Sequence, residues 1–226
     1  MLKTPDRTTH TRKCLVQCVN DYLLIMLIFL NDNVLIADHN ILININILFY
    51  PWLALLQYAR EFLLCSGSLI SPRLILTAAH CINGPNRAPI SYFIKIICLP
   101  TVDLFPQFNK NTNFTVAGWG IDESGESSDV KKHVRLPFVR EDYCKERYSD
   151  LPLLNVICAG GEAGKDTCNG DSGGPLMYED SSSFSIIGIL SFGYRECGIA
   201  GWPSVYTNVF QYMKWIKDVT EGRIKI

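Results

Sequence analysis

The chain has 226 residues, long enough for one all-β domain that contains two barrels. Its formal net charge of −1 and the lack of a basic run argue against a nucleic-acid partner. Nine cysteines are more than a chain of the reducing cytosol normally carries, so we expect a secreted, extracellular protein. A hydrophobic share of 48%, with 16 Gly and 11 Pro, is typical of a globular β-rich protein with many turns.

Residues 1–49 differ in composition from the rest of the chain, because they contain no glycine. Within them, residues 22–30 form an apolar stretch with the length of a signal-peptide core, too short to span a bilayer. Three interpretations stay open for this stretch: a signal sequence, a foreign or wrongly joined segment, and a buried strand. Residues 41–48 alternate in polarity and predict a strand. We expect an atypical N-terminal segment over 1–49 and a globular domain over 50–226.

After residue 50, short runs of apolar residues alternate with turn residues, and each run predicts a strand. Residues 210–221 change to a helical period, since Phe210, Met213, Ile216 and Val219 fall on one face. Many short strands followed by one terminal helix favour an all-β barrel architecture. The predicted strands are 52–58, 64–70, 74–78, 114–118, 133–139, 156–159, 184–192 and 205–209.

The glycine-rich segment 166–175, Asp-Thr-Cys-Asn-Gly-Asp-Ser-Gly-Gly-Pro, has the pattern of an activated nucleophile. A serine hydroxyl needs a base to take its proton, and backbone N–H groups must stabilise the oxyanion that forms. The glycines around Ser172 permit the tight turn that this chemistry requires. A second segment, residues 76–81 (Leu-Thr-Ala-Ala-His-Cys), supplies His80 as the candidate base. Together the two segments predict a serine peptidase.

Seven short motifs follow one another between residues 50 and 207. They are Tyr50-Pro51-Trp52, Cys65-Ser66-Gly67-Ser68-Leu69-Ile70, Thr77-Ala78-Ala79-His80-Cys81, Ile97-Cys98-Leu99-Pro100, Gly118-Trp119-Gly120, Gly170-Asp171-Ser172-Gly173-Gly174-Pro175 and Pro203-Ser204-Val205-Tyr206-Thr207. With these motifs, residues 50–221 resemble the trypsin-like (chymotrypsin-fold) serine endopeptidases, most of all their clip-domain branch. The resemblance implies an all-β fold of two antiparallel β-barrels with a C-terminal helix. It also implies a protein or peptide substrate, serpin-type inhibitors and no cofactor.

The resemblance implies a catalytic role for three residues. His80 matches the general base and Ser172 the nucleophile. The backbone N–H groups of Gly170 and Ser172 match the oxyanion hole.

Four further residues match substrate-binding positions of the family. Asp166 matches the floor of the primary specificity pocket, where a carboxylate selects a substrate Arg or Lys. Ser191 and Gly193 match the strand that pairs with the substrate backbone. Ser204 stands where the family usually has glycine, so a serine there could narrow the pocket without blocking it.

Six of the nine cysteines match family disulfides, with the implied pairs Cys65–Cys81, Cys144–Cys158 and Cys168–Cys197. Each would restrict the unfolded chain and contribute about 2–4 kcal/mol. The clip-domain equivalent of Cys98 pairs with a cysteine upstream of the activation cleavage, a role open to Cys14 or Cys18. No cysteine set has zinc-finger spacing, so we expect no metal site. Asn113 begins a glycosylation sequon, which fits secretion.

The family pattern fails at the triad acid. Family members carry a long segment between the equivalents of His80 and Cys98, with the triad aspartate in an apolar strand. Residues 81–97 contain neither Asp nor Glu, so that segment is missing and the first barrel is expected to be incomplete. Replacing the triad Asp by Asn in this family lowers turnover by about 10⁴. Asp103 is the nearest acid downstream, but its context is that of a solvated loop.

The pattern also fails at the activation site. The family matures by cleavage before an Ile-Val-Gly-Gly-like sequence, and the new α-amino group pairs with the acid before the nucleophile, here Asp171. No such sequence precedes Tyr50. Asp171 would then face an apolar interior unpaired, which is unfavourable.

Three hypotheses fit these observations. The first is a secreted endopeptidase that cleaves after Arg or Lys, and the second is a non-catalytic homologue that binds a partner in a protease cascade. In the third, the sequence is a gene model of an active enzyme that lacks an internal exon and carries a wrong 5′ exon. For the chain as it stands we predict little or no peptidase activity.

Overall fold

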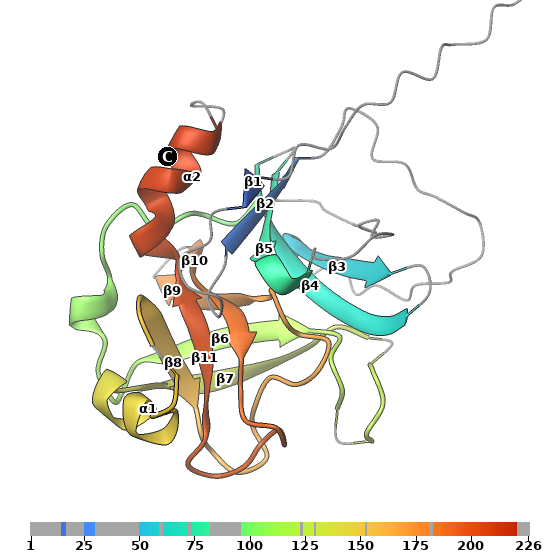
Figure 1. Ribbon diagram of the computed structural model, residues 1–226, viewed down its shortest axis with the longest axis vertical. Helices are drawn as coiled ribbons and strands as arrows, with labels where there is room; N and C mark the ends of the chain where they lie inside the picture. Colours follow the sequence, from blue (N-terminus) through green and yellow to red (C-terminus); the bar gives the residue numbers. More distant parts are fainter. Residues whose placement is uncertain are drawn as a thin grey trace, which may run out of the picture.

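The computed structural model describes residues 15–16, 25–29, 50–58, 61–71, 74–81, 96–122, 124–128, 130–151, 153–180 and 183–220. These residues are mostly β-strand. They form a closed barrel, a second sheet and a short C-terminal helix (Figure 1). The arrangement fits the double-barrel fold and confirms the predicted all-β class.

The second half of the chain forms the closed barrel. Its six strands follow the order β10-β11-β8-β7-β6-β9, and every neighbouring pair is antiparallel. The barrel interior is filled by large buried side chains, including Phe114, Leu136 and Tyr206. The strands are β6 (Asn113–Gly118), β7 (Lys132–Val139), β8 (Val156–Gly160), β9 (Pro175–Asp180), β10 (Ser183–Phe192) and β11 (Pro203–Asn208).

The first half forms a five-stranded antiparallel sheet in the order β1-β2-β5-β4-β3. Within the described ranges this sheet is open, as expected for an incomplete first barrel. All five residues of β5 are buried, and four of them are apolar; the exception is Thr77. The strands are β1 (Leu15–Val16), β2 (Ile25–Phe29), β3 (Leu53–Tyr58), β4 (Glu61–Ser71) and β5 (Leu74–Ala78).

The N-terminal segment contributes to this sheet through β2. Its residues pair with β5 in antiparallel register, from Ile25 opposite Ala78 to Phe29 opposite Leu74. The apolar stretch 22–30 therefore contains a strand. The strand predicted over 41–48 lies outside the described residues.

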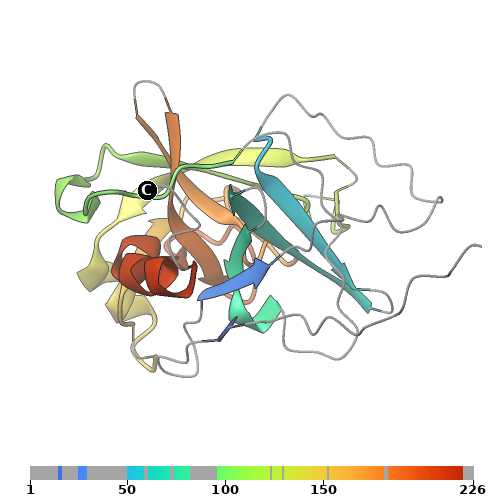
Figure 2. The same cartoon turned by 90° about the horizontal axis from the view of Figure 1, so that it is seen from above.

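The C-terminal helix α2 (Met213–Thr220) follows a 3₁₀ turn, η3 (Val209–Tyr212), so the predicted helical segment 210–221 is confirmed. Helix α2 lies beside β2 in both views (Figure 1, Figure 2). Its Ile216 is fully buried in a core that also contains Leu76 of β5, Met177 of β9 and Ile189 of β10. This core therefore joins the helix to both halves of the molecule.

Two strands and one helix were missed by the sequence patterns: β1, β9 and α1. Helix α1 (Glu141–Arg147) buries only Cys144, so it has no apolar stripe, and its charges suit the helix dipole instead. Strand β9 begins at Pro175, the last residue of the serine motif, so turn residues precede it instead of an apolar run. In the described part of the chain, no helix is long and apolar enough to cross a membrane.

Candidate active site

The turn that carries Ser172 is anchored on β10 by its main chain. Gly173 N donates to Leu190 O, and Leu190 N donates to Gly174 O, each at 2.9 Å. Gly170 and Gly173 have φ angles of +102° and +80°, which residues with a side chain rarely adopt. The glycines of the motif are therefore required by the backbone of the turn.

The same turn docks onto the first sheet. Ser66 N in β4 donates to Ser172 O at 2.7 Å, and the Thr77 hydroxyl in β5 donates to Ser66 O at 2.7 Å. A Cβ at Gly173 would lie 2.2 Å from Thr77 Oγ1 and 2.4 Å from Ser66 O, so no side chain fits there. Thr77 belongs to the motif that contains His80, so this motif provides both the candidate base and the docking surface for the nucleophile turn.

His80 lies in the 3₁₀ turn η1 (Ala79–Cys81), directly after β5, and its side chain is exposed. A ring nitrogen of His80 lies within 4.8 Å of the sulfurs of Cys65 and Cys81. Those two sulfurs form a disulfide, so they offer no thiolate to a metal ion. The Cys81 sulfur also contacts Ser172 O at 3.4 Å. The disulfide therefore brings the His80 and Ser172 segments together where the two halves meet.

The main chain at Gly170 and Ser172 offers two N–H donors. Among the residues that the structure describes, neither N–H is bonded to an acceptor. Two such donors on one tight turn can stabilise an oxyanion.

Asp166 is surrounded by hydrogen-bond donors. Its Oδ1 accepts from Thr167 N at 2.8 Å and from the Ser204 hydroxyl at 2.7 Å, and its Oδ2 accepts from Gly198 N at 3.0 Å. The disulfide Cys168–Cys197 ties the segment after Asp166 to the loop that carries Gly198. The Asp166 side chain remains half-buried rather than enclosed.

The other expected substrate-binding residues lie next to Asp166 and at the end of β10. A Cβ at Gly193 would lie 2.9 Å from Ser204 Oγ, so the two residues are in contact across the site. Ser191 occupies the bulge between Leu190 and Phe192, where the pairing of β10 with β11 shifts register. The structure thus brings Asp166, Ser204 and Gly193 together, with Ser191 two residues before Gly193.

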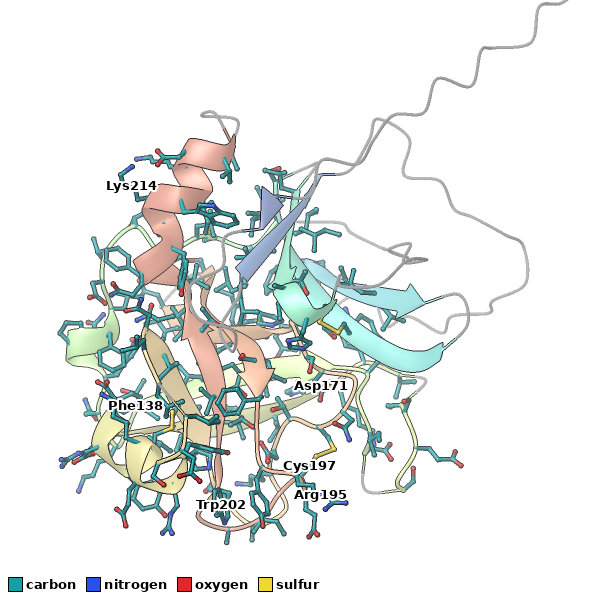
Figure 3. All side chains as sticks on the ribbon, in the orientation of Figure 1. Phe138, Asp171, Arg195, Cys197, Trp202 and Lys214 are labelled. Atoms are coloured by element: carbon teal, nitrogen blue, oxygen red, sulfur yellow. A yellow bond between two sulfur atoms is a disulfide. The ribbon has the colours of Figure 1, made fainter. Side chains whose placement is uncertain are left out.

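Asp171 is half-buried, and Figure 3 shows it between the first sheet and the loop that carries Cys197. Its Oδ1 accepts from Gly120 N at 2.8 Å and its Oδ2 accepts from Cys168 N at 3.0 Å. We expected this carboxylate to face an apolar interior, and this expectation was wrong, because two backbone N–H groups bind it. Within the described ranges no Lys, Arg or His forms an ion pair with it. Burial raises the pKa of Asp171 in spite of the two hydrogen bonds.

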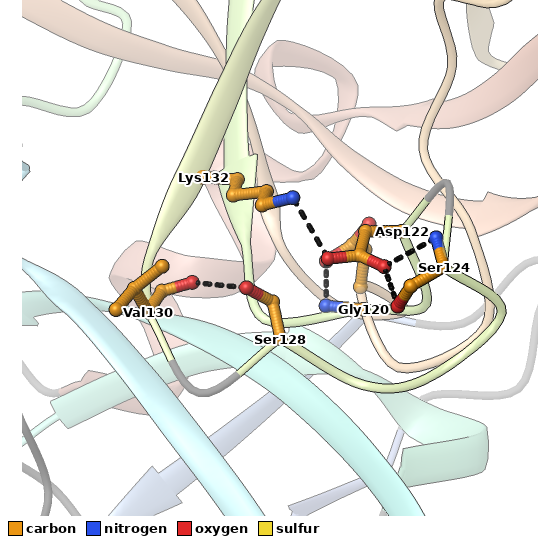
Figure 4. Close-up of polar contacts among 7 residues, drawn as sticks. Gly120, Asp122, Ser124, Ser128, Val130 and Lys132 are labelled. Carbon is orange, nitrogen blue, oxygen red and sulfur yellow. Dashed lines mark hydrogen bonds and ion pairs between the residues drawn. The ribbon is translucent and has the colours of Figure 1, made fainter.

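A cavity of about 180 Å³ lies beside Asp171, and its lining includes Asp166 and Lys132. Lys132 is paired with another acid, since its Nζ lies 2.7 Å from Asp122 Oδ2 (Figure 4). Ser124 donates its N–H and its hydroxyl to Asp122 Oδ1. These hydrogen bonds lower the pKa of Asp122, and the bond from Lys132 has the largest effect. They hold the loop that presents Gly120 to Asp171.

Lys131 connects this loop to the start of β3. Its Nζ donates to Tyr50 O at 3.0 Å and lies 5.2 Å from the ring centroid of Trp119. Burial lowers the pKa of Lys131 to about 8. Sequence reasoning missed this link because it depends on a contact between residues far apart in the chain.

Asp103 has a local role. Its Oδ1 accepts from Phe105 N at 3.0 Å, at the start of the 3₁₀ turn η2 (Phe105–Gln107), and its side chain is exposed. This is the solvated loop position that the sequence predicted. The bond occupies Asp103 with its own turn rather than with His80.

The structure contains disulfides in the three pairings that the resemblance implied: Cys65–Cys81, Cys144–Cys158 and Cys168–Cys197. Cys98 is exposed and forms no disulfide with any cysteine of the described ranges. Cys14 and Cys18 lie outside those ranges, so their pairing with Cys98 stays a prediction.

Comparison with protein families gives a match to the family model "Trypsin" over residues 45–90 and 85–216. The match consists of two pieces that meet at residues 85–90. This junction falls inside the acid-free stretch 81–97 that follows His80.

Curated relatives agree with this match. The chain is 34% identical to the phenoloxidase-activating enzyme of Bombyx mori over 258 residues, covering 76% of this chain and 58% of the relative. It is 32% identical to the CLIP domain-containing serine protease HP8 of Bombyx mori, over 76% of this chain and 66% of the relative. It is 35% identical to the CLIP domain-containing serine protease B4 of Anopheles gambiae, over 75% of this chain and 66% of the relative. The chain therefore spans less than two thirds of the length of these relatives.

Proposed function

Because the chain belongs to the trypsin family of serine peptidases, we propose that this site is a serine endopeptidase site for proteins with a basic residue at the cleaved bond. Ser172 is the nucleophile, His80 the general base, and the N–H groups of Gly170 and Ser172 form the oxyanion hole. The observation that carries the proposal is the docking of the Ser172 turn onto the sheet of His80, with the 2.7 Å bond from Ser66 N to Ser172 O. That bond positions nucleophile and base segments against each other.

The preference for a basic side chain rests on Asp166. Its carboxylate is half-buried and lies beside Gly193 and Ser204, in a site walled by the Cys168–Cys197 disulfide. A carboxylate attracts an ammonium or guanidinium group from the substrate by charge-assisted hydrogen bonding. We propose that this attraction selects Lys or Arg at the cleaved bond.

The natural substrates would be other proteins cut at a limited number of bonds. Relatives of this chain carry names such as phenoloxidase-activating enzyme and Spaetzle-processing enzyme, which describe such limited cleavage. Three disulfides support an extracellular location, where serpin-type proteins would be the natural inhibitors.

We further propose that the chain as it stands has little peptidase activity. Residues 81–97 contain no carboxylate, and the family match is divided inside that stretch. In this family the triad acid orients the base and stabilises its charged form, and replacing that acid lowers turnover by about 10⁴. The same observation favours a second candidate function, a non-catalytic homologue that binds a protein partner through an intact second barrel.

A fluorophosphonate probe tests the activity directly. With the purified full chain we expect very slow labelling at Ser172, because residues 81–97 contain no acid in the place of the triad aspartate. The Ser172→Ala control should not be labelled. Labelling at the rate of an ordinary serine peptidase would contradict the reduced activity and support the active enzyme.

Sequencing the native transcript across the codons for residues 81–90 separates the remaining alternatives. An insert of several tens of residues with an Asp in an apolar strand would restore the enzyme hypothesis. An uninterrupted junction would make the non-catalytic homologue the leading function.

A further inference from the structure

The Asp166 carboxylate has an unusual set of partners because Ser204 has a side chain. Ser204 is 1% exposed, and its hydroxyl donates to Asp166 Oδ1 at 2.7 Å. The Thr167 hydroxyl lies 3.1 Å from Ser204 Oγ. Since the single Ser204 proton is directed to Asp166, Thr167 is the donor in this second bond. The two hydroxyls thus form a chain that ends on Asp166.

Counting acceptor sites shows what this chain does to Asp166. A carboxylate has about four lone-pair sites, two on each oxygen. Both sites of Oδ1 are used, by Thr167 N and by the Ser204 hydroxyl. One site of Oδ2 is used by Gly198 N at 3.0 Å. A single acceptor site therefore remains, and it is on Oδ2.

Arginine and lysine differ in what they need from a carboxylate. A guanidinium binds best through two parallel N–H bonds, one to each oxygen, whereas an ammonium is a point charge that one oxygen satisfies. With Oδ1 filled, the two-oxygen bond to a guanidinium requires the Ser204 hydroxyl to leave. A guanidinium that binds both oxygens therefore competes with this hydroxyl for Oδ1.

We propose that Ser204 is a specificity-determining residue: its hydroxyl makes the Asp166 site prefer a lysine side chain over an arginine side chain. The inference rests on the proposed function, since it assigns Asp166 to the substrate side chain. Without the Ser204 hydroxyl, one site on each oxygen would be open, and the preference would move toward arginine. Loss of one hydrogen bond to a charged group corresponds to roughly a tenfold change in relative affinity.

The test uses two small cations with the same ring, benzylamine (an ammonium) and benzamidine (an amidinium with two parallel N–H groups). Their dissociation constants are measured by calorimetry or NMR titration with the full chain, which needs no catalysis. We expect Ser204→Ala and Ser204→Gly each to shift the ratio of the two constants about tenfold in favour of benzamidine. A matching near-ultraviolet circular dichroism spectrum shows that each variant is folded.

The outcomes separate the two proposals. If Asp166→Ala leaves binding of both cations unchanged, or the folded wild-type chain binds neither, the pocket assignment fails and this inference fails with it. If binding depends on Asp166 but the ratio is the same in wild type and Ser204→Ala, only the role of the hydroxyl is overturned. A shift in Ser204→Gly but not in Ser204→Ala would also overturn it, because the volume of the side chain would then decide.

Discussion

The two halves of this molecule hold their share of the site in different ways. The second half is a closed six-stranded barrel with two disulfides, and it positions Ser172, Asp166 and Ser204 from several strands and loops. In the part of the first half that is described, the sheet is open, has one disulfide, and presents His80 at its edge with an exposed side chain. The comparison indicates that the proposed binding site is built by one half, while His80, the proposed base, comes from the exposed edge of the other half.

The largest expected effect comes from breaking the contact between the halves with Gly173→Ala. The new Cβ would lie 2.2 Å from Thr77 Oγ1, and the φ of +80° adds strain. We expect the free energy of unfolding to fall by at least about 3 kcal/mol. Urea denaturation measures this change.

Gly125→Ala is the matched control for this variant. Gly125 has a similar φ of +82°, but nothing lies within 4 Å of its would-be Cβ. The cost there should be only about 1–2 kcal/mol of backbone strain. Equal losses in the two variants would show that strain, and not docking of the turn, limits Gly173.

A second variant tests the core that the halves share with α2. Ile216 is fully buried in that core, so Ile216→Ala should lower the free energy of unfolding by about 3 kcal/mol. The control is Lys214→Ala on the exposed face of α2, which breaks the ion pair with Asp218 at 2.6 Å and should cost at most about 0.5 kcal/mol. A small loss for Ile216→Ala would mean that α2 does not connect the halves.

Disulfide removal separates stability from binding within the second half. Replacing Cys168 and Cys197 by Ala, or Cys144 and Cys158 by Ala, should each cost about 2–4 kcal/mol in thermal unfolding. Only the first pair borders Asp166, so only its loss should weaken benzamidine binding. Weakened binding in both variants would indicate a general loosening of the barrel.

The smallest effect is a dependence on pH at Asp171. Because burial raises the pKa of Asp171 above its unfolded value of 3.8, the native state binds the proton more tightly. The stability that the native state gains by holding this proton is fully present below pH 3.8. It is lost as the pH rises through the native pKa of Asp171. We expect wild-type stability to fall relative to Asp171→Asn as the pH rises above about 4. Parallel stability curves over that range would contradict a raised pKa.

Most of the second half could be predicted from local patterns. Apolar runs bounded by turn residues marked the strands, and the helical period of Ile216 and its neighbours marked α2, because each reflects burial along one element. Strand β9 and helix α1 were missed, since the first starts inside the serine motif and the second has almost no buried face. A strand was one of three alternatives for residues 22–30, and its pairing with β5 was not predicted, because an apolar stretch does not specify its partner.

The sequence by itself determined the chemistry that is available: the nucleophile and base motifs, and the lack of an acid in residues 81–97. These follow from residue identity and short-range spacing. Only the tertiary structure decided which groups meet. The bond from Ser204 to Asp166, the backbone donors on Asp171 and the docking of Gly173 against Thr77 all join residues far apart in the chain. Such contacts depend on how strands pack, and no local pattern in the chain records that packing.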